Sequence, residues 1–308
     1  MSLNFSVLKS GLLSDSPLVL VSTGVLAPGA VAFHFRLKRL PTTTIQANLN
    51  TWRLHDGGLK IMVCVSTMYN GCFYDCGLCE GVLGGKNLTE EEIIFQVWHI
   101  LFSRYLTVGK VREMEINFFG IGEPFVNPNV LKAIRTWDEL LDEPLITLST
   151  HGPKTGRKVF EGAVALFLSG VKIRCQVSVD LLNDHKRFSY MDITDSPGTK
   201  SWSLSELSAL TRSWLTRTRT AAVANFVVTN HPQFGAWTAD DYDLLRQLFP
   251  PPTVIKLSYE SWTHGGTQDT MASVGELETR RRMLVDQGWP VEVFVLPGTH
   301  VPGGGCGA

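Results

Sequence analysis

The sequence of 308 residues predicts an α/β fold with a mainly parallel, barrel-like sheet. Short apolar runs rich in β-branched and aromatic residues recur along the chain, and segments with helical patterning lie between them. No internal repeat or low-complexity tract breaks this alternation. Strands that alternate with helices favour right-handed crossovers, so the strands are expected to pair in parallel.

Each predicted strand is short and β-rich. The predicted strands span Leu59–Ser66, Met114–Phe119, Leu145–Ser149, Lys172–Val179, Ala222–Thr229, Val254–Ser258 and Val291–Leu296. Thr89 is an N-cap candidate, because three glutamates follow it as an acidic first turn, and the helix that it opens is predicted to reach about Tyr105. The other predicted helices span Asn129–Leu141, Arg157–Leu168, Ser203–Thr216, Asp240–Leu248 and Gly275–Gln287.

Two segments flank the predicted core at residues 51–296. Residues 1–50 are expected to form a strand-rich or loop-rich extension, and residues 297–308 a flexible tail with a run of glycines. The stretch from Pro17 to Phe35 is apolar, but Gly24, Pro28 and Gly29 interrupt it, so it is too broken to span a bilayer. No membrane partner is expected.

Composition is that of an ordinary soluble enzyme, with 44% hydrophobic and 19% charged residues. The net charge of −1 argues against a protein whose main task is to grip RNA, since such proteins usually carry a basic excess or face. Six cysteines in a chain without an evident signal peptide indicate a reducing compartment, so the cytoplasm is the expected location.

Three cysteines fall in one short segment: Cys72, Cys76 and Cys79, with the spacing C-x3-C-x2-C. Three thiolates from one loop can ligate three irons of a [4Fe–4S] cluster and leave the fourth open to a small molecule, whereas ferredoxin-type clusters use four cysteines. Structural zinc is the alternative, but zinc normally takes four protein ligands and no second paired motif follows. The spacing resembles that of radical S-adenosylmethionine (SAM) enzymes, in which SAM chelates the open iron.

Further motifs resemble the RlmN/Cfr family of radical SAM methylating enzymes, in order over about residues 52–308. Segment 64–72, CVSTMYNGC, resembles C-V-S-S-x-x-G-C with one extra residue, and segment 119–129, FGIGEPFVNPN, resembles F-x-G-x-G-E-P…N. Segments 148–152, LSTHG, and 177–184, VSVDLLND, resemble L-S-T-S-G and L-S-L-H-A-P-N-D, and GCG at 305–307 matches a C-terminal C-G. The resemblance implies a partial (β/α)6 radical SAM barrel.

The resemblance also implies a set of SAM contacts. Glu123 would bind the amino group of SAM, and glycines at positions 120 and 122 would let a ligand approach the backbone closely. The alternative is a glycine-rich turn followed by a capping glutamate. The remaining contacts would come from strand ends, where a serine is also common in turns and caps. These candidate contacts are Gly120, Gly122, Glu123, Ser149, Ser178 and Ser261; Asp180 and Ser261 depart from the family pattern.

Two further cysteines carry the catalytic roles that the resemblance implies. Cys306 would take a methyl group from one SAM, and a second SAM, cleaved at the cluster, would supply the radical that activates this methyl for addition to an sp2 carbon. Cys64 would then resolve the crosslink as a disulfide. The alternatives are an incidental exposed thiol and a buried strand cysteine; Cys175 is expected to be a core residue.

The substrate is the least determined feature of the sequence. About sixty residues precede Cys64, which is too few for the N-terminal RNA-binding domain of the family, so a small (hetero)aromatic or biosynthetic substrate is favoured. Methylation of an adenine in rRNA or tRNA is the alternative, and another radical SAM reaction or an iron–sulfur sensor are further ones. An external electron donor such as a flavodoxin or a ferredoxin is the expected partner.

Overall fold

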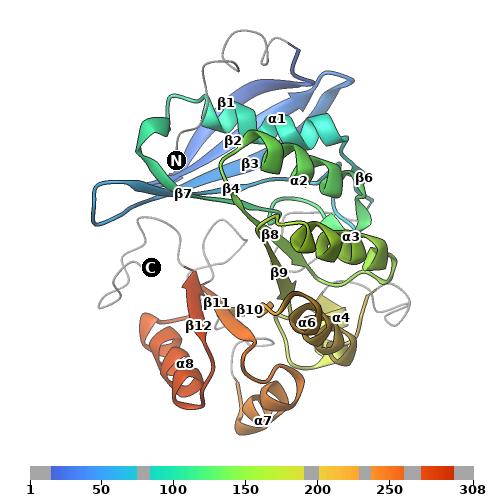
Figure 1. The fold of residues 1–308 in the computed structure, drawn as a ribbon, viewed down its shortest axis with the longest axis vertical. Helices are drawn as coiled ribbons and strands as arrows, with labels where there is room; N and C mark the ends of the chain where they lie inside the picture. The colour runs from blue at the N-terminus through green and yellow to red at the C-terminus, as the bar shows by residue number, and fades with distance from the viewer. Residues whose placement is uncertain (1–14, 75–83, 191–200, 229–236, 260–271, 295–308) are drawn as a thin grey trace. The chain divides into compact units, whose positions relative to one another are not determined.

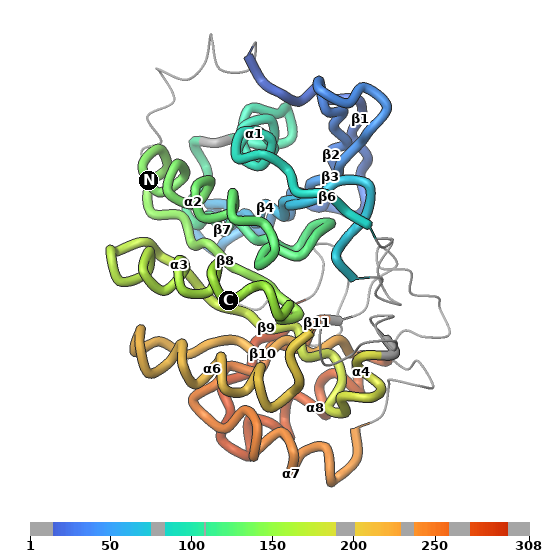
Figure 2. The backbone as a smooth tube through the Cα atoms, turned by 90° about the vertical axis from the view of Figure 1, so that its right-hand side faces the viewer, coloured from blue at the N-terminus to red at the C-terminus, as the bar shows by residue number. Residues whose placement is uncertain are grey.

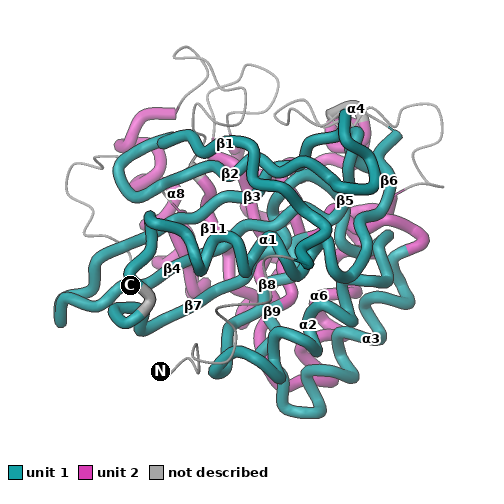
Figure 3. The backbone as a smooth tube through the Cα atoms, turned by 90° about the horizontal axis from the view of Figure 1, so that it is seen from above, with its two compact units in different colours: residues 1–73, 81–149, 156–174 teal, residues 74–80, 150–155, 175–308 magenta. Residues whose placement is uncertain are grey.

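The computed structural model describes residues 15–74, 84–190, 201–228, 237–259 and 272–294 (Figure 1). The chain divides into two compact units (Figure 3). The first comprises residues 1–73, 81–149 and 156–174, and the second comprises residues 74–80, 150–155 and 175–308.

The first unit is built on strands that change from antiparallel to parallel pairing. In spatial order they are β1 (Leu18–Ala27), β2 (Ala30–Leu37), β3 (Leu40–Arg53), β4 (Leu59–Cys64), β7 (Val111–Asn117) and β8 (Leu145–Thr150). The strands from β1 to β4 pair antiparallel, whereas β4 pairs parallel with β7 and β7 parallel with β8. The predicted N-terminal extension is therefore strand-rich. A short ribbon of β5 (Met68–Tyr69) and β6 (Lys86–Asn87) brackets the cysteine segment.

Three helices follow one another along this unit: α1 (Glu90–Leu101), α2 (Asn129–Leu140) and α3 (Arg157–Leu168), with α1 against α2 and α2 against α3 (Figure 2). Thr89 caps α1 as predicted. Its hydroxyl accepts the amide of Glu92 at 3.2 Å, and the Glu92 carboxylate accepts the amide of Thr89 at 2.9 Å. This reciprocal cap satisfies two amides that a helix start otherwise leaves without partners.

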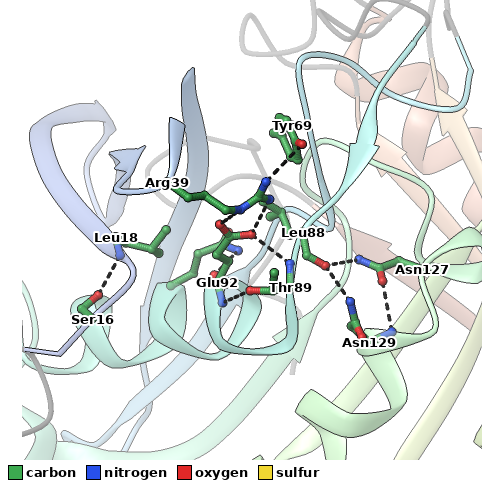
Figure 4. A network of polar contacts seen from close by, with 10 residues as sticks. Ser16, Leu18, Arg39, Tyr69, Leu88, Thr89, Glu92, Asn127 and Asn129 are labelled. Atoms are coloured by element: carbon green, nitrogen blue, oxygen red, sulfur yellow. Dashed lines mark hydrogen bonds and ion pairs between the residues drawn. The ribbon is translucent and has the colours of Figure 1, made fainter. Parts of the chain in front are cut away.

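Arg39, in the turn between β2 and β3, joins the antiparallel strands to α1 (Figure 4). Its Nε and Nη2 donate to the two oxygens of Glu92 at 2.6 and 2.9 Å, and its Nη1 donates to the Tyr69 hydroxyl at 3.2 Å. Glu92 is almost fully buried, and the ion pair with the Arg39 guanidinium offsets the free-energy cost of burying its negative charge.

The second unit continues the β/α alternation with parallel strands only. Its elements are β9 (Ile173–Ser178, whose first two residues belong to the first unit), α4 (Asp184–Tyr190), α6 (Leu204–Thr218), β10 (Val223–Val228), α7 (Ala239–Leu248), β11 (Val254–Tyr259), α8 (Val274–Asp286) and β12 (Val291–Phe294). The strands pair in the order β9, β10, β11, β12. Capping boxes at Ser203, Thr238 and Ser273 begin α6, α7 and α8.

The predicted alternation of seven strands with intervening helices is confirmed, with shifts of a few residues at the ends. The first predicted strand reaches Ser66, but β4 ends at Cys64, because the next residues form hydrogen bonds with the segment that follows β7. Among the described residues, no helix combines the length and apolar composition needed to cross a bilayer.

Candidate functional site

The carboxyl ends of β4 and β7 bring Cys64 beside a polar strand residue. Cys64 is the last residue of β4 and lies opposite Asn117, the last residue of β7, in the parallel register. The thiol is buried, with 6% of the residue exposed, and the Nδ2 of Asn50 donates to its Sγ at 3.8 Å. In parallel sheets ligands bind at this end of the strands, so Cys64 lies where the sequence interpretation requires it.

Below this end, one face of β7, β8 and β9 carries a buried hydrogen-bond network. The Oε1 of Glu115 accepts from the Thr147 hydroxyl at 2.6 Å, from Nη2 of Arg174 at 3.0 Å and from Nδ2 of Asn117 at 3.2 Å. The Oδ1 of Asn117 in turn accepts from the Ser149 hydroxyl at 3.0 Å. Ser149 is thus a strand residue whose hydroxyl is oriented by the network, not a turn residue.

The strands of the second unit also carry buried polar side chains. Ser178 ends β9, is buried, and pairs in register with Asn225 of β10. The Oδ1 of Asn225 accepts from the Ser258 hydroxyl at 2.6 Å, and Nζ of Lys256 donates to Oε1 of Gln176 at 3.1 Å. These amides and the lysine are further candidate ligand contacts.

Most of these polar strand residues were not predicted from the sequence. Their signal was present, because polar residues alternate with apolar ones inside the strands, as in MEIN at 114–117, RCQVS at 174–178 and IKLS at 255–258. A period of two places these side chains on one face of the sheet. The missed residues are Glu115, Asn117, Thr147, Arg174, Gln176, Asn225, Lys256 and Ser258.

A backbone hydrogen bond joins the first cysteine of the cysteine segment to a residue that follows the segment. The amide of Gly85 donates to the carbonyl of Cys72 at 3.2 Å, and a Cβ on Gly85 would lie 2.8 Å from the amide nitrogen of Cys72. Cys72 is partly exposed, and Cys76 and Cys79 lie outside the described residues. The donor set of three thiols on one segment fits a [4Fe–4S] cluster with an open iron. Among the residues that the structure describes, no group of three His, Cys, Asp or Glu side chains could hold a metal.

Gly120 and Gly122, which follow β7, must be glycines for a reason that the sequence did not predict. The amide of Gly120 donates to the carbonyl of Val65 at 3.1 Å, and a Cβ on Gly120 would lie 2.6 Å from that oxygen. Gly122 has a φ of +118°, and its Cβ would lie 2.4 Å from the Thr67 hydroxyl. Both glycines therefore permit the close approach of the segment that leads to the cysteines, and not only of a ligand.

Glu123 acts as a cap in this structure. It is buried, and its Oε1 accepts the amide of Phe125 at 3.0 Å, at the start of the short 3-10 helix Pro124–Val126. This is the alternative interpretation of the motif. A carboxylate can accept several hydrogen bonds, so the cap leaves the predicted contact with an ammonium group possible.

Asn127 joins the two ends of the cysteine segment (Figure 4). Its Nδ2 donates to the carbonyls of Thr67 at 2.8 Å and Leu88 at 3.0 Å, which stand before and after the cysteines. Its Oδ1 accepts the amide of Asn129 at 3.0 Å, and Nδ2 of Asn129 also donates to Leu88. The Asn-Pro-Asn motif is thus a structural clasp for the candidate cluster loop.

Replacing Asn127 by alanine should lower the free energy of unfolding by about 1–3 kcal/mol, because buried carbonyls lose their donor. It should also reduce the iron retained after reconstitution. Asn129→Ala is the comparison variant and should lose less, since Asn129 is only partly buried and donates to one of the two carbonyls. Urea titration and iron analysis measure both effects, and equal losses in the two variants would contradict the leading part of Asn127 in the clasp.

The remaining predicted site residues, Ser261 and Cys306, lie outside the described residues. Cys64, Cys72, Gly120, Gly122, Glu123 and Ser149 belong to the first unit, and Ser178 belongs to the second.

Comparisons with known proteins agree with these motifs. No protein-family model matches the chain. A probable dual-specificity RNA methyltransferase RlmN of Thermosipho melanesiensis is 30% identical over 173 residues, covering 51% of this chain and 46% of the relative. One from Halalkalibacterium halodurans is 29% identical over 209 residues, covering 60% and 53%. A radical SAM methyltransferase structure from Sphaerobacter thermophilus superposes with a TM-score of 0.70 at 20% identity, covering 94% of this chain and 81% of that one.

The chain is related to the RlmN-type radical SAM methyltransferases. It spans about half the length of the curated RlmN relatives that it matches. A SAM-bound SuiB structure from Streptococcus suis also shares the fold, with a TM-score of 0.51 at 11% identity over 76% of this chain and 50% of that one. The RlmN relationship implies a [4Fe–4S] cluster and SAM as cofactors, which agrees with the donor set of the cysteine segment. The printed name of these relatives gives RNA as their substrate, whereas the sequence ranked a small molecule first for this chain.

Proposed function

We propose that the chain is a radical SAM methyltransferase that methylates an sp2 carbon of an RNA adenine, with Cys306 as the methyl carrier. The observation that carries the proposal is the position of Cys64. It ends β4 in the first unit, at the strand end from which the chain leads to the cysteine segment. The names of the RlmN relatives support RNA as the substrate.

In this proposal Cys72, Cys76 and Cys79 hold the cluster, and Glu123, Ser149 and Ser178 contact SAM together with Ser261. When bound, the cluster and SAM supply a methyl group and a carbon radical. An external flavodoxin or ferredoxin provides electrons.

Cys64 closes the reaction. Its thiolate attacks the sulfur of Cys306, and the bond from that sulfur to the substrate-bound carbon breaks. The carbon keeps the electron pair and takes up a proton to become the methyl group of the product, and the two cysteines remain joined as a disulfide. The Nδ2 of Asn50 donates to the Sγ of Cys64 and orients it at this strand end.

Cys64→Ala should still allow methylation of Cys306 but should leave the substrate attached to Cys306, because no second thiol displaces it. Intact-mass analysis of the reconstituted protein after turnover with SAM, reductant and RNA should show protein plus substrate. The substitution itself should cost only about 1 kcal/mol of stability.

Cys175→Ala is the matched control, because Cys175 is also a buried strand cysteine and burial raises the pKa of its thiol to about 12. This thiol stays protonated, so the control should release product normally. Release at the wild-type rate from Cys64→Ala, without an adduct, would show that Cys64 is only a strand residue. An unmodified Cys306 after incubation with SAM and reductant would reject the methyl-carrier mechanism.

A small heteroaromatic substrate is the second candidate, and the net charge of −1 favours it. The two candidates differ in their salt dependence. Binding of an RNA substrate should weaken steeply as salt rises, because phosphate contacts release counterions, whereas binding of a small uncharged substrate should not.

A further inference from the structure

The first strand of the sheet, β1, is uncharged and carries much exposed apolar surface. Within the described part of the chain it pairs only with β2 and lies at the border of the first unit (Figure 1). Its residues, LVLVSTGVLA, include no charged side chain and no proline. The most exposed apolar residues on it are Leu20, Val21, Val25 and Leu26, at 39, 54, 68 and 40%. The apolar surface of this unit is therefore concentrated at one edge.

An edge strand of this kind is a template for pairing with another chain, because its outer side presents backbone amides and carbonyls that no sheet neighbour uses. Proteins usually protect such an edge with lysine, proline, bulges or a covering segment. β1 has two bulges, at Val21 and Leu26, where one extra residue breaks the register with β2. They flank the regular stretch of residues 22–25, so they limit the length of an added ladder but leave its middle regular.

The exposed apolar residues are arranged symmetrically about Thr23. Leu20 and Leu26 are equally far from Thr23 in the sequence, and so are Val21 and Val25. When two β1 strands pair antiparallel about a two-fold axis at Thr23, Leu20 of one copy lies opposite Leu26 of the other. Val21 then lies opposite Val25. The strand is therefore complementary to a second copy of itself, as an isologous interface requires.

The centre of this arrangement fits as well. Ser22 would lie opposite Gly24, where the space is open, because a Cβ added to Gly24 would meet no atom within 4 Å. The hydroxyl of Thr23 is hydrogen-bonded to the Tyr105 hydroxyl at 2.8 Å, so the middle of β1 is already fixed to its own unit. A second strand can therefore add at the outer side without a rearrangement of this contact.

The charges at this edge select a second copy over other occupants. An RNA strand needs cations for its phosphates, and β1 supplies none. A charged peptide would leave its charges against apolar side chains. The cation bound to this region is Arg104, whose Nη2 donates to the Tyr105 hydroxyl at 3.0 Å. Two such cations near a two-fold axis repel each other, and salt screens that repulsion.

We propose that two copies of this chain form a symmetric dimer by antiparallel pairing of their β1 strands about Thr23. The inference goes beyond the proposed function and does not depend on the RNA substrate or on SAM. Because each copy contributes a single strand, the interface is small, and the dissociation constant should be on the order of micromolar.

The first test is anaerobic sedimentation of the cluster-reconstituted chain over a concentration series. The wild type should be a dimer at high concentration and should dissociate on dilution, and added salt should not weaken the dimer. Val25→Lys should weaken association by about tenfold or more, because the change occurs twice in the dimer and places an amine opposite Val21. Val25 is mostly exposed, so thermal unfolding of the monomer should stay unchanged.

A charge pair across the interface separates this effect from a folding defect. Val21→Glu combined with Val25→Lys should restore part of the association, because the glutamate of each copy lies opposite the lysine of the other. Leu168→Lys is the matched control, since Leu168 is an exposed apolar residue on α3 of the same unit. It should leave the dimer unchanged.

Cysteine substitutions test the register. Thr23→Cys should form a disulfide between copies under mild oxidation, because residues directly opposite in an antiparallel pair have Cα atoms about 4.5–5.5 Å apart. Ser22→Cys is the matched control and should not, because position 22 of the other copy is displaced along the ladder beyond the limit of about 7 Å. Peptide mapping separates a link at position 23 from links through the native cysteines.

Three results would each overturn the inference. The first is a wild-type chain that stays monomeric over the whole concentration series. The second is a dimer that Val25→Lys leaves intact, which would place the interface elsewhere. The third is a dimer in which Thr23→Cys forms no link between copies, or no more than Ser22→Cys does.

Discussion

Replacing Cys72, Cys76 and Cys79 together by alanine is expected to abolish the visible absorption of the cluster and all cleavage of SAM. The three thiols are the complete donor set of the predicted site, and a [4Fe–4S] cluster has no other protein ligand in this arrangement. Visible spectra, iron analysis and 5′-deoxyadenosine formation measure the loss.

Cys175→Ala is the control, because it removes a thiol that lies buried in β9. It should keep full iron content. The triple variant should still fold around the clasp of Asn127, since the base of the cysteine segment is held by backbone carbonyls and not by the thiols. Full iron content in the triple variant would reject the assignment of the cluster ligands.

The second large effect is expected at Glu115, whose side chain is 6% exposed. Glu115→Ala should lower the free energy of unfolding by about 3–5 kcal/mol, because it removes one partner of a buried ion pair and leaves the Arg174 guanidinium, 20% exposed, without this carboxylate. Thr147 and Asn117 lose the same acceptor, so Ser149 should also lose its orientation. Urea unfolding measures the stability change.

Glu113→Ala on the same strand is the matched control. Its carboxylate pairs with Lys60 at 3.5 Å and its side chain is 57% exposed, so the expected cost is about 0–1 kcal/mol. Glu115→Gln keeps an acceptor oxygen and should fall between the two. If Glu115→Ala costs no more than Glu113→Ala, the network does not stabilise this unit.

The site residues that could be predicted from the sequence are those that short sequence patterns identify. The cysteine motif and the position of each polar motif after a strand follow from short patterns, and the structure places Cys64, Ser149 and Ser178 at or next to strand ends, with Glu123 in the segment after β7. What these residues contact was not predictable. The hydroxyl of Ser66 accepts the amide of Ile121, 55 residues away, and no local pattern encodes such a pairing.

The interpretation of two neighbouring features of one motif is affected. The glycines at positions 120 and 122 seemed to make room for a ligand, yet their Cβ directions face the backbone and side chains of residues 65–68. Glu123 combines its predicted location with a capping hydrogen bond to Phe125. The neighbours that explain the two glycines come from a segment more than 50 residues away, whereas the cap of Glu123 is a local hydrogen bond.

The sequence by itself determined the alternation of strands and helices, the helix start at Thr89 and the cysteine spacing, because periodicity, capping and ligand spacing are all short-range. Only the tertiary structure decided that Asn127 clasps the cysteine segment and that His151 meets Asp180. The physical reason is that parallel strands bring together, at their carboxyl ends, residues separated by a whole helix and its loops, and the register that selects each neighbour is a property of the folded sheet.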